Sequence, residues 1–93
     1  MARVKVKLAG MIDRRMVNQV YDEEVAEGAK LEELFKQIDK KGGWGKAYFK
    51  KLLKLPMPPV LLVNGEQVDL DRIKDLVVKD GDEVALLMPM AGG

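Results

Sequence analysis

The chain has 93 residues, of which 47% are hydrophobic and 33% are charged, and its formal net charge is +1. This length and composition predict one small globular domain, and the charge balance does not favour binding to nucleic acid or to an anionic surface. The sequence contains no Cys, His, Ser or Thr. These absences exclude zinc sites built from Cys and His, iron–sulfur clusters held by Cys, disulfides, and catalysis by the usual hydroxyl or thiol nucleophiles. We therefore do not expect the chain to catalyse a reaction with its own side chains.

The N-terminal part of the chain predicts a hairpin of two strands. Val4, Val6 and Leu8 alternate with charged residues, which is the period of a strand with one buried face. Gly10 is expected to end this strand. Residues 16–25 are richer in Val and Tyr than in helix-forming residues, so they are expected to return as a second, more exposed strand.

An amphipathic helix is predicted to follow Gly28. Apolar residues recur there at positions i, i+3, i+4 and i+7, and charged residues occupy the other side; the apolar residues are Leu31, Leu34, Phe35 and Ile38. Gly42 and Gly43 are expected to end the helix. Because one helix cannot bury its apolar stripe alone, it is expected to lie across a sheet. A second, shorter helical segment is expected over residues 47–55.

The C-terminal half predicts two more strands and a short helical turn. Residues 60–63 form a short apolar strand, and Asn64-Gly65 after it is a strong signal for a tight hairpin turn. One helical turn is expected within residues 69–76. Residues 83–88 form a strand that is apolar almost throughout, which favours a central position in the sheet with both faces covered or in contact.

The order of these elements predicts an α+β domain with the β-grasp, or ubiquitin-like, fold. The first and last strands are expected to form the centre of one mixed sheet of four to five strands, with one main helix packed across it. Residues 1–87 are predicted to form this single domain, and residues 88–93 a flexible C-terminal tail.

Three patterns that resemble ligand sites are better explained as structural features. Residues 42–46 lack the Ser or Thr that follows the Lys of a phosphate-binding loop. The acidic residues within 69–83 do not follow the spacing of a calcium loop, so no bound metal or cofactor is expected. The basic residues between Lys40 and Lys54 are interpreted as a solvated helix surface. The alternative for this basic segment is a docking patch for an acidic partner, and nucleic acid is not an expected ligand.

Targeting and membrane insertion are not expected. The apolar stretches are far shorter than a bilayer span. The alternating N-terminal residues are also unlike the apolar core of a signal peptide. The predicted location is therefore cytoplasmic.

The last residues are the most informative part of the chain, because an apolar strand runs into Gly92 and Gly93. Pro89 restricts φ where the chain leaves the strand, which favours a presented tail over a frayed one. A carboxylate is a poor electrophile and must be activated, for instance as an acyl-adenylate formed at the α-phosphate of ATP. Two residues without side chains suit the narrow channel of an adenylating partner. The tail therefore predicts a carrier or a tag.

Two segments of the sequence resemble the MoaD/ThiS family of ubiquitin-like sulfur carriers. They are Val63-Asn64-Gly65-Glu66 and residues 79–93, which read Lys-Asp-Gly-Asp-Glu-Val-Ala-Leu-Leu-Met-Pro-Met-Ala-Gly-Gly. The chain length is more similar to MoaD, the small subunit of molybdopterin synthase, than to the shorter ThiS type. This resemblance implies that the Gly93 carboxylate is adenylated and converted to a thiocarboxylate, and that its sulfur is then used in molybdenum cofactor biosynthesis.

The resemblance also implies partners and contact positions. A MoeB/ThiF-like adenylyltransferase would use ATP, and the large subunit of molybdopterin synthase or another acceptor would take the sulfur. The positions implied to contact these partners are Gly92, Ala91, Pro89 and Leu87. The apolar sheet face near Leu62 and Leu87 is a further predicted contact. Alternatives are a thiamine-pathway carrier, a ubiquitin-like protein modifier and a non-covalent interaction module.

Overall fold

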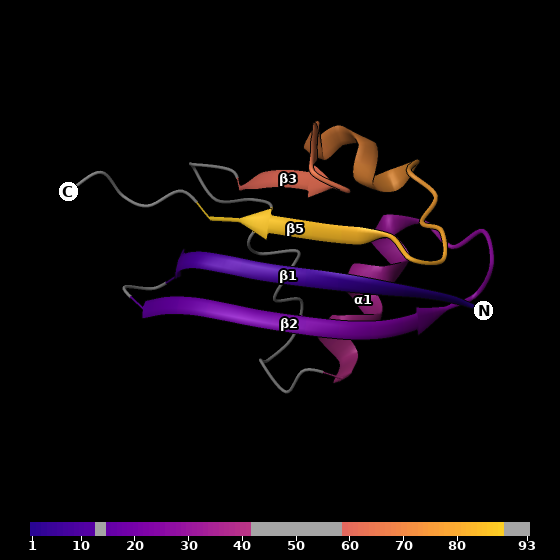
Figure 1. The fold of residues 1–93 in the computed structure, drawn as a ribbon, viewed down its shortest axis with the longest axis horizontal. Coiled ribbons are helices and arrows are strands. Elements are labelled where there is room, and N and C mark those ends of the chain that lie inside the picture. The colour runs from indigo at the N-terminus through magenta and orange to yellow at the C-terminus, as the bar shows by residue number, and fades with distance from the viewer. Residues whose placement is uncertain (13–14, 42–58, 89–93) are drawn as a thin grey trace.

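The computed structural model describes residues 1–12, 15–41 and 59–88. They form one five-stranded mixed sheet with the strand order β2-β1-β5-β3-β4, and a helix lies behind the sheet in Figure 1. The strands are β1 (Ala2–Ile12), β2 (Arg15–Val25), β3 (Val60–Val63), β4 (Glu66–Val68) and β5 (Glu83–Leu87). The helices are α1 (Leu31–Lys41) and a single 3₁₀ turn, η1 (Leu70–Lys74). The predicted β-grasp architecture is confirmed. The helix expected over residues 47–55 lies outside the described residues.

Strands β1 and β2 form the predicted hairpin, but β1 is longer than expected. The antiparallel register runs from Ala2 opposite Val25 to Ile12 opposite Arg15, so Gly10 does not end the strand. Gly10 pairs with Val17 within the hairpin and has a φ of 126°. A glycine can adopt this φ because it has no Cβ atom, so the strand continues through this position.

Strands β1 and β5 form the centre of the sheet, as predicted from the first and last apolar segments. They are parallel, with Val6 opposite Val84 and Ala9 opposite Leu87, and β5 pairs on its other side with β3 in the antiparallel direction. Only one face of β5 is fully covered. Val84 and Leu86 are buried, whereas Ala85 and Leu87 are half-buried because α1 packs on the other face of the sheet.

The core lies between this inner sheet face and α1. The apolar stripe of the helix, which the sequence predicts, is 3% exposed or less at all four positions, and the alternating residues of β1 are fully buried. The core residues of these two elements are Leu31, Leu34, Phe35, Ile38, Ala2, Val4, Val6 and Leu8. Burying one such Leu or Val stabilises the fold by about 1.5–3 kcal/mol. No helix in the described part of the chain is long and apolar enough to cross a membrane.

A hydrogen-bond network connects the β3–β4 turn to the start of β5. Asn64 and Gly65 have φ values of 51° and 85°, which are the positive values that the predicted tight turn requires. The Asn64 side chain donates to Asp82 Oδ1 at 3.0 Å and accepts from the Glu83 N–H at 2.9 Å. Asp82 Oδ2 accepts from the Lys79 N–H at 2.7 Å. Asn64 and Asp82, which belong to the two segments that resemble the MoaD/ThiS family, therefore have a structural role.

Candidate functional site at the outer sheet face and the base of the tail

The face of the sheet that points away from α1 carries the predicted contact positions Leu62 and Leu87. We call this surface the outer face. Side chains alternate along a strand, so Leu62 lies on the outer face together with Ala85, its partner on β5. Leu87 is opposite Val60 on the same face. Both Leu62 and Leu87 are half-buried, which leaves part of each side chain available to a partner.

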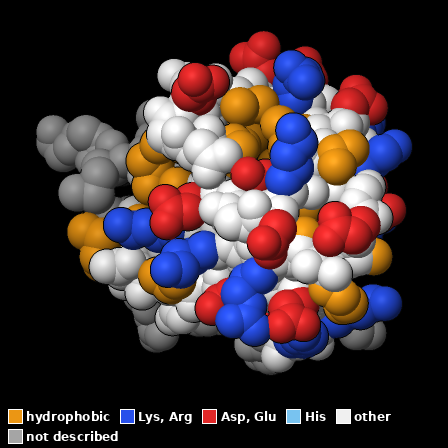
Figure 2. Space-filling view, turned by 45° about the vertical axis from the view of Figure 1, so that its right-hand side comes forward, with side chains coloured by type: hydrophobic (Ala, Val, Ile, Leu, Met, Phe, Trp, Pro, Cys, Tyr) orange, Lys and Arg blue, Asp and Glu red, His pale blue; other side chains and the backbone are white. Residues whose placement is uncertain are grey.

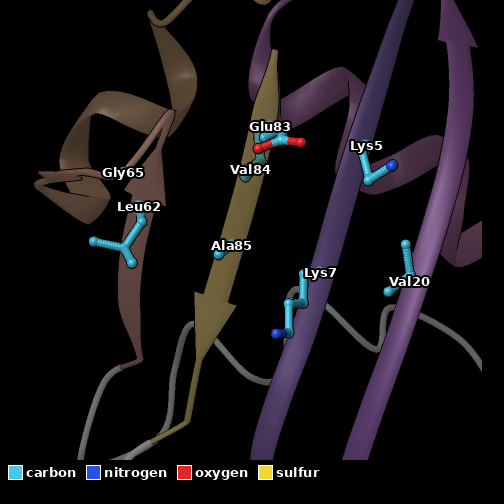
Figure 3. A pocket seen from close by; sticks show the side chains of 8 residues that line it. All are labelled: Lys5, Lys7, Val20, Leu62, Gly65, Glu83, Val84 and Ala85. Atoms are coloured by element: carbon cyan, nitrogen blue, oxygen red, sulfur yellow. The ribbon is translucent and has the colours of Figure 1, made fainter. Parts of the chain in front are cut away.

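An open hollow of about 230 Å³ lies on the outer face. Figure 3 shows that Ala85 lies between the longer side chains of Leu62 on β3 and Lys7 on β1, with Val20 on β2 beyond. The short side chain of Ala85 accounts for the depression at this point. The residues that line the hollow are Lys5, Lys7, Val20, Leu62, Gly65, Glu83, Val84 and Ala85. A depression of this kind can accept one apolar side chain from a partner.

Charges are distributed unevenly along the outer face. Arg3 at one end donates to Glu24 at 2.6 Å and lies 3.8 Å from Asp22, and the hydrogen bond to Glu24 together with these charges raises the pKa of Arg3. By contrast, no ion pair holds Lys5 or Lys7 within the described residues. The rim of the hollow therefore presents two ammonium groups together with the carboxylate of Glu83, the partner of Lys5 on β5.

Figure 2 shows acidic and basic side chains interspersed over the visible face, in agreement with a net charge of +1. Within residues 1–12, 15–41 and 59–88, no three Asp or Glu side chains come together as a metal site. Among the described residues of the outer face, Lys5 and Lys7 therefore offer a local attraction to an acidic group.

Met88, the last described residue before the tail, directly follows Leu87 of the outer face. Met88, which the sequence analysis assigned to the tail, is only 4% exposed. Its N–H donates to the Ala9 carbonyl oxygen at 2.7 Å, which extends the contact between β5 and β1 by one residue. Its side chain shares the inner face with Leu86 because alternate side chains of β5 point into the core.

The structure brings together only part of the predicted site. It places Leu62 and Leu87 on one face close to the base of the tail, whereas the predicted positions Pro89, Ala91, Gly92 and Gly93 lie outside the described residues. Sequence reasoning missed four contributors to the face, which are Lys5, Lys7, Val20 and Ala85. The alternation of β1 already placed both lysines on the solvent side, but their proximity to Leu62 depends on the order of the strands.

Comparisons with known proteins agree with this architecture. The model of the ThiS family matches residues 13–93. The solution structure of Urm1 from Trypanosoma brucei is similar with a TM-score of 0.60 and 23% sequence identity, over 98% of this chain and 95% of that chain. At this identity the similarity supports the fold alone. No curated protein sequence matches the chain. Because the family match extends over most of the sequence, the chain belongs to the ThiS family of ubiquitin-like sulfur carriers, as its C-terminal segment indicates.

Proposed function

We propose that this protein carries sulfur on the carboxylate of Gly93 for molybdenum cofactor biosynthesis. The observation that carries the proposal is the ThiS family match through the diglycine end of the sequence. The outer face supports it, because its half-buried residue Leu87 directly precedes Met88 at the base of the tail. The greater chain length, compared with the ThiS type, favours the MoaD branch and hence the molybdopterin pathway over the thiamine pathway.

The proposed chemistry takes place in partner active sites. A carboxylate oxygen of Gly93 attacks the α-phosphate of ATP in a MoeB/ThiF-like adenylyltransferase, and pyrophosphate leaves. A persulfide sulfur then attacks the acyl-adenylate carbon and displaces AMP, and a thiol reductant cleaves the resulting acyl disulfide to release the thiocarboxylate. The large subunit of molybdopterin synthase holds the pterin precursor that accepts the sulfur. This protein supplies the carboxyl group and positions it in the active sites of its partners.

The outer face is the proposed docking site for the adenylyltransferase. An apolar side chain of the partner occupies the hollow above Ala85, and Leu62 and Leu87 contact the surrounding surface. Partner carboxylates lie beside Lys5 and Lys7, which increases the rate of encounter and selects the orientation.

The decisive experiment is the intact mass of the protein after incubation with ATP, a MoeB-type adenylyltransferase and a persulfide donor. The expected result is a mass gain equal to the replacement of one oxygen by sulfur, located on the peptide that contains Gly93. The matched control is the chain without Gly93, which is expected to remain folded and unmodified. An unchanged mass of the full chain, while a known carrier in the same mixture is loaded, would overturn the proposal.

The sulfur acceptor is tested separately. The loaded protein is mixed either with the large subunit of molybdopterin synthase and its pterin precursor or with the thiazole-forming enzymes of the thiamine pathway. Sulfur transfer to the pterin alone is the expected result, and transfer to the thiazole alone would assign the chain to the thiamine branch. Recovery of isopeptide adducts between Gly93 and lysines of cellular proteins would instead favour a ubiquitin-like modifier.

A further inference from the structure

The last described residue, Met88, lies directly against Gly10 of β1. A Cβ atom built on Gly10 would be 2.5 Å from the Met88 carbonyl oxygen, 2.6 Å from its Cβ and 2.9 Å from its nitrogen. Real Cβ atoms essentially never show non-bonded contacts this short. The backbone of the chain at the base of the tail therefore occupies the space that a side chain at residue 10 would need.

The conformation of Gly10 adds a second requirement for glycine. Its φ of 126° lies in a region that residues with a side chain rarely adopt. The adjacent residue, Ala9, accepts the Met88 N–H at 2.7 Å, so residues 9 and 10 together define the position of Met88. A larger residue at position 10 would have to change the local path of β1, displace Met88, or both.

Crowding distinguishes Gly10 from the other glycines in the described part of the chain. Gly28, Gly65 and Gly81 also have positive φ values, between 81° and 87°. A Cβ at any of these three positions would meet nothing within 4 Å. Of these four glycines, only Gly10 lies so close to another part of the chain that a Cβ atom would clash. The clashing residue is Met88, at the base of the tail.

We propose that Gly10 is a positioning residue for the C-terminal tail. By seating Met88 against β1, it defines the point from which residues 89–93 leave the domain relative to the outer face. This inference rests on the proposed carrier function, in which the partner binds the outer face and the carboxyl group of Gly93 at the same time. A defined starting point for the tail aligns the carboxylate with the partner's reaction centre, and a misplacement of about 1 Å can cost up to roughly 10²-fold in rate.

The test compares Gly10→Ala with the matched control Gly28→Ala. Both variants add a Cβ at a positive φ, but only the first also crowds Met88. Three quantities are measured for each folded protein. They are the hydrogen-exchange rate of the Met88 amide, and the kcat and KM of adenylation when the concentration of this protein is varied. For Gly10→Ala we expect faster exchange at Met88 and a kcat lower by about tenfold or more, with KM changed less than about twofold because the docking surface is intact.

The control defines what a purely structural role would produce. Gly28→Ala is expected to lower thermal stability while the Met88 exchange rate and kcat stay at the wild-type values. An unchanged kcat in Gly10→Ala, measured on folded protein, would overturn the proposal. An equal loss of kcat in Gly28→Ala would overturn it too, because backbone strain anywhere would then explain the effect.

A second variant covers the case in which Gly10→Ala does not fold. Met88→Pro removes the N–H that donates to Ala9 and leaves the β1–β2 hairpin unaltered in sequence. It is expected to lower kcat with little change in KM, and a wild-type kcat would contradict the positioning role. If the wild-type chain itself is not adenylated, the proposed function fails. The exchange rate of the Met88 amide in Gly10→Ala then decides whether Gly10 seats the base of the tail.

Discussion

Individual side chains in this protein have clearly different roles on the two faces of the sheet. On the inner face, Val6 and Leu86 are fully buried and contribute to stability through the core. On the outer face, Lys5 and Lys7 alternate with those core residues and have no ion-pair partner within the described residues. Substitutions on the outer face should therefore affect partner binding more than folding.

Reversing the two lysine charges tests the docking surface. We expect the Lys5→Glu, Lys7→Glu double variant to raise the KM of adenylation by about tenfold at low salt, because like charges at a rim mainly slow association. The effect should shrink as ionic strength rises. The matched control is the Lys30→Glu, Lys74→Glu double variant, which makes the same change in net charge at two exposed lysines outside the hollow, and for which KM should stay near its wild-type value. Equal effects in both variants would show that net charge, and not this surface, matters.

Asp82 is expected to be important for stability and not for loading. Its carboxylate accepts hydrogen bonds from the Asn64 side chain and from the Lys79 N–H at 3.0 and 2.7 Å. Asp82→Ala should lower the free energy of unfolding by about 1–3 kcal/mol, measured by urea denaturation, because both donors lose a charged acceptor. Asp75→Ala, at an exposed carboxylate, should change it by less than about 0.5 kcal/mol. A wild-type midpoint for Asp82→Ala would contradict a structural role for this network.

At the scale of elements, β5 connects the core to the docking surface and to the tail. Its inner side chains pack beneath the sheet, its outer side chains contribute Ala85 and Leu87 to the outer face, and Met88 continues it along β1. One five-residue strand therefore contributes both to the core and to the outer face.

Filling the hollow tests the outer face of β5. Ala85→Leu adds three carbon atoms toward open space, so thermal stability should change little. The added side chain occupies the volume proposed for the partner's apolar anchor, and KM for adenylation should rise about tenfold or more, since removing one buried anchor contact typically costs 2 kcal/mol or more. Val77→Leu, at a residue that is 44% exposed and outside the hollow, is the control. An unchanged KM for Ala85→Leu would remove the hollow from the docking model.

Helix α1 was predictable in nearly every respect. Its apolar stripe, its approximate ends and the order of elements around it all follow from short-range periodicity, because a 3.6-residue repeat is a local property. The same holds for the Asn64-Gly65 turn, where only residues tolerant of positive φ fit. The extension of β1 past Gly10 was not predictable, since it depends on pairing with Val17 across the hairpin.

At the scale of the whole molecule, the proposed function separates a folded domain from the carboxyl group that reacts. Deleting Gly92 and Gly93 is expected to leave the free energy of unfolding within about 0.5 kcal/mol of the full chain, because glycine has no side chain to bury. Sulfur loading should be lost entirely, as judged by intact mass. A large fall in stability would show that the two glycines belong to the folded domain. As a control, the full chain is denatured and refolded in parallel, so that losses caused by the procedure are not attributed to the deletion.

The sequence alone determined the class of chemistry, the order of the main elements and the apolar positions of β1 and α1 that face the inner core. These depend on which side chains are present and on their local spacing. Only the tertiary structure decided which residues share the outer face, because Leu62, Ala85 and Lys7 meet through the pairing of three strands that are far apart in the chain. The contact of Gly10 with Met88 likewise exists because parallel pairing of β1 with β5 brings the two ends of the sequence together, and no local pattern records that approach.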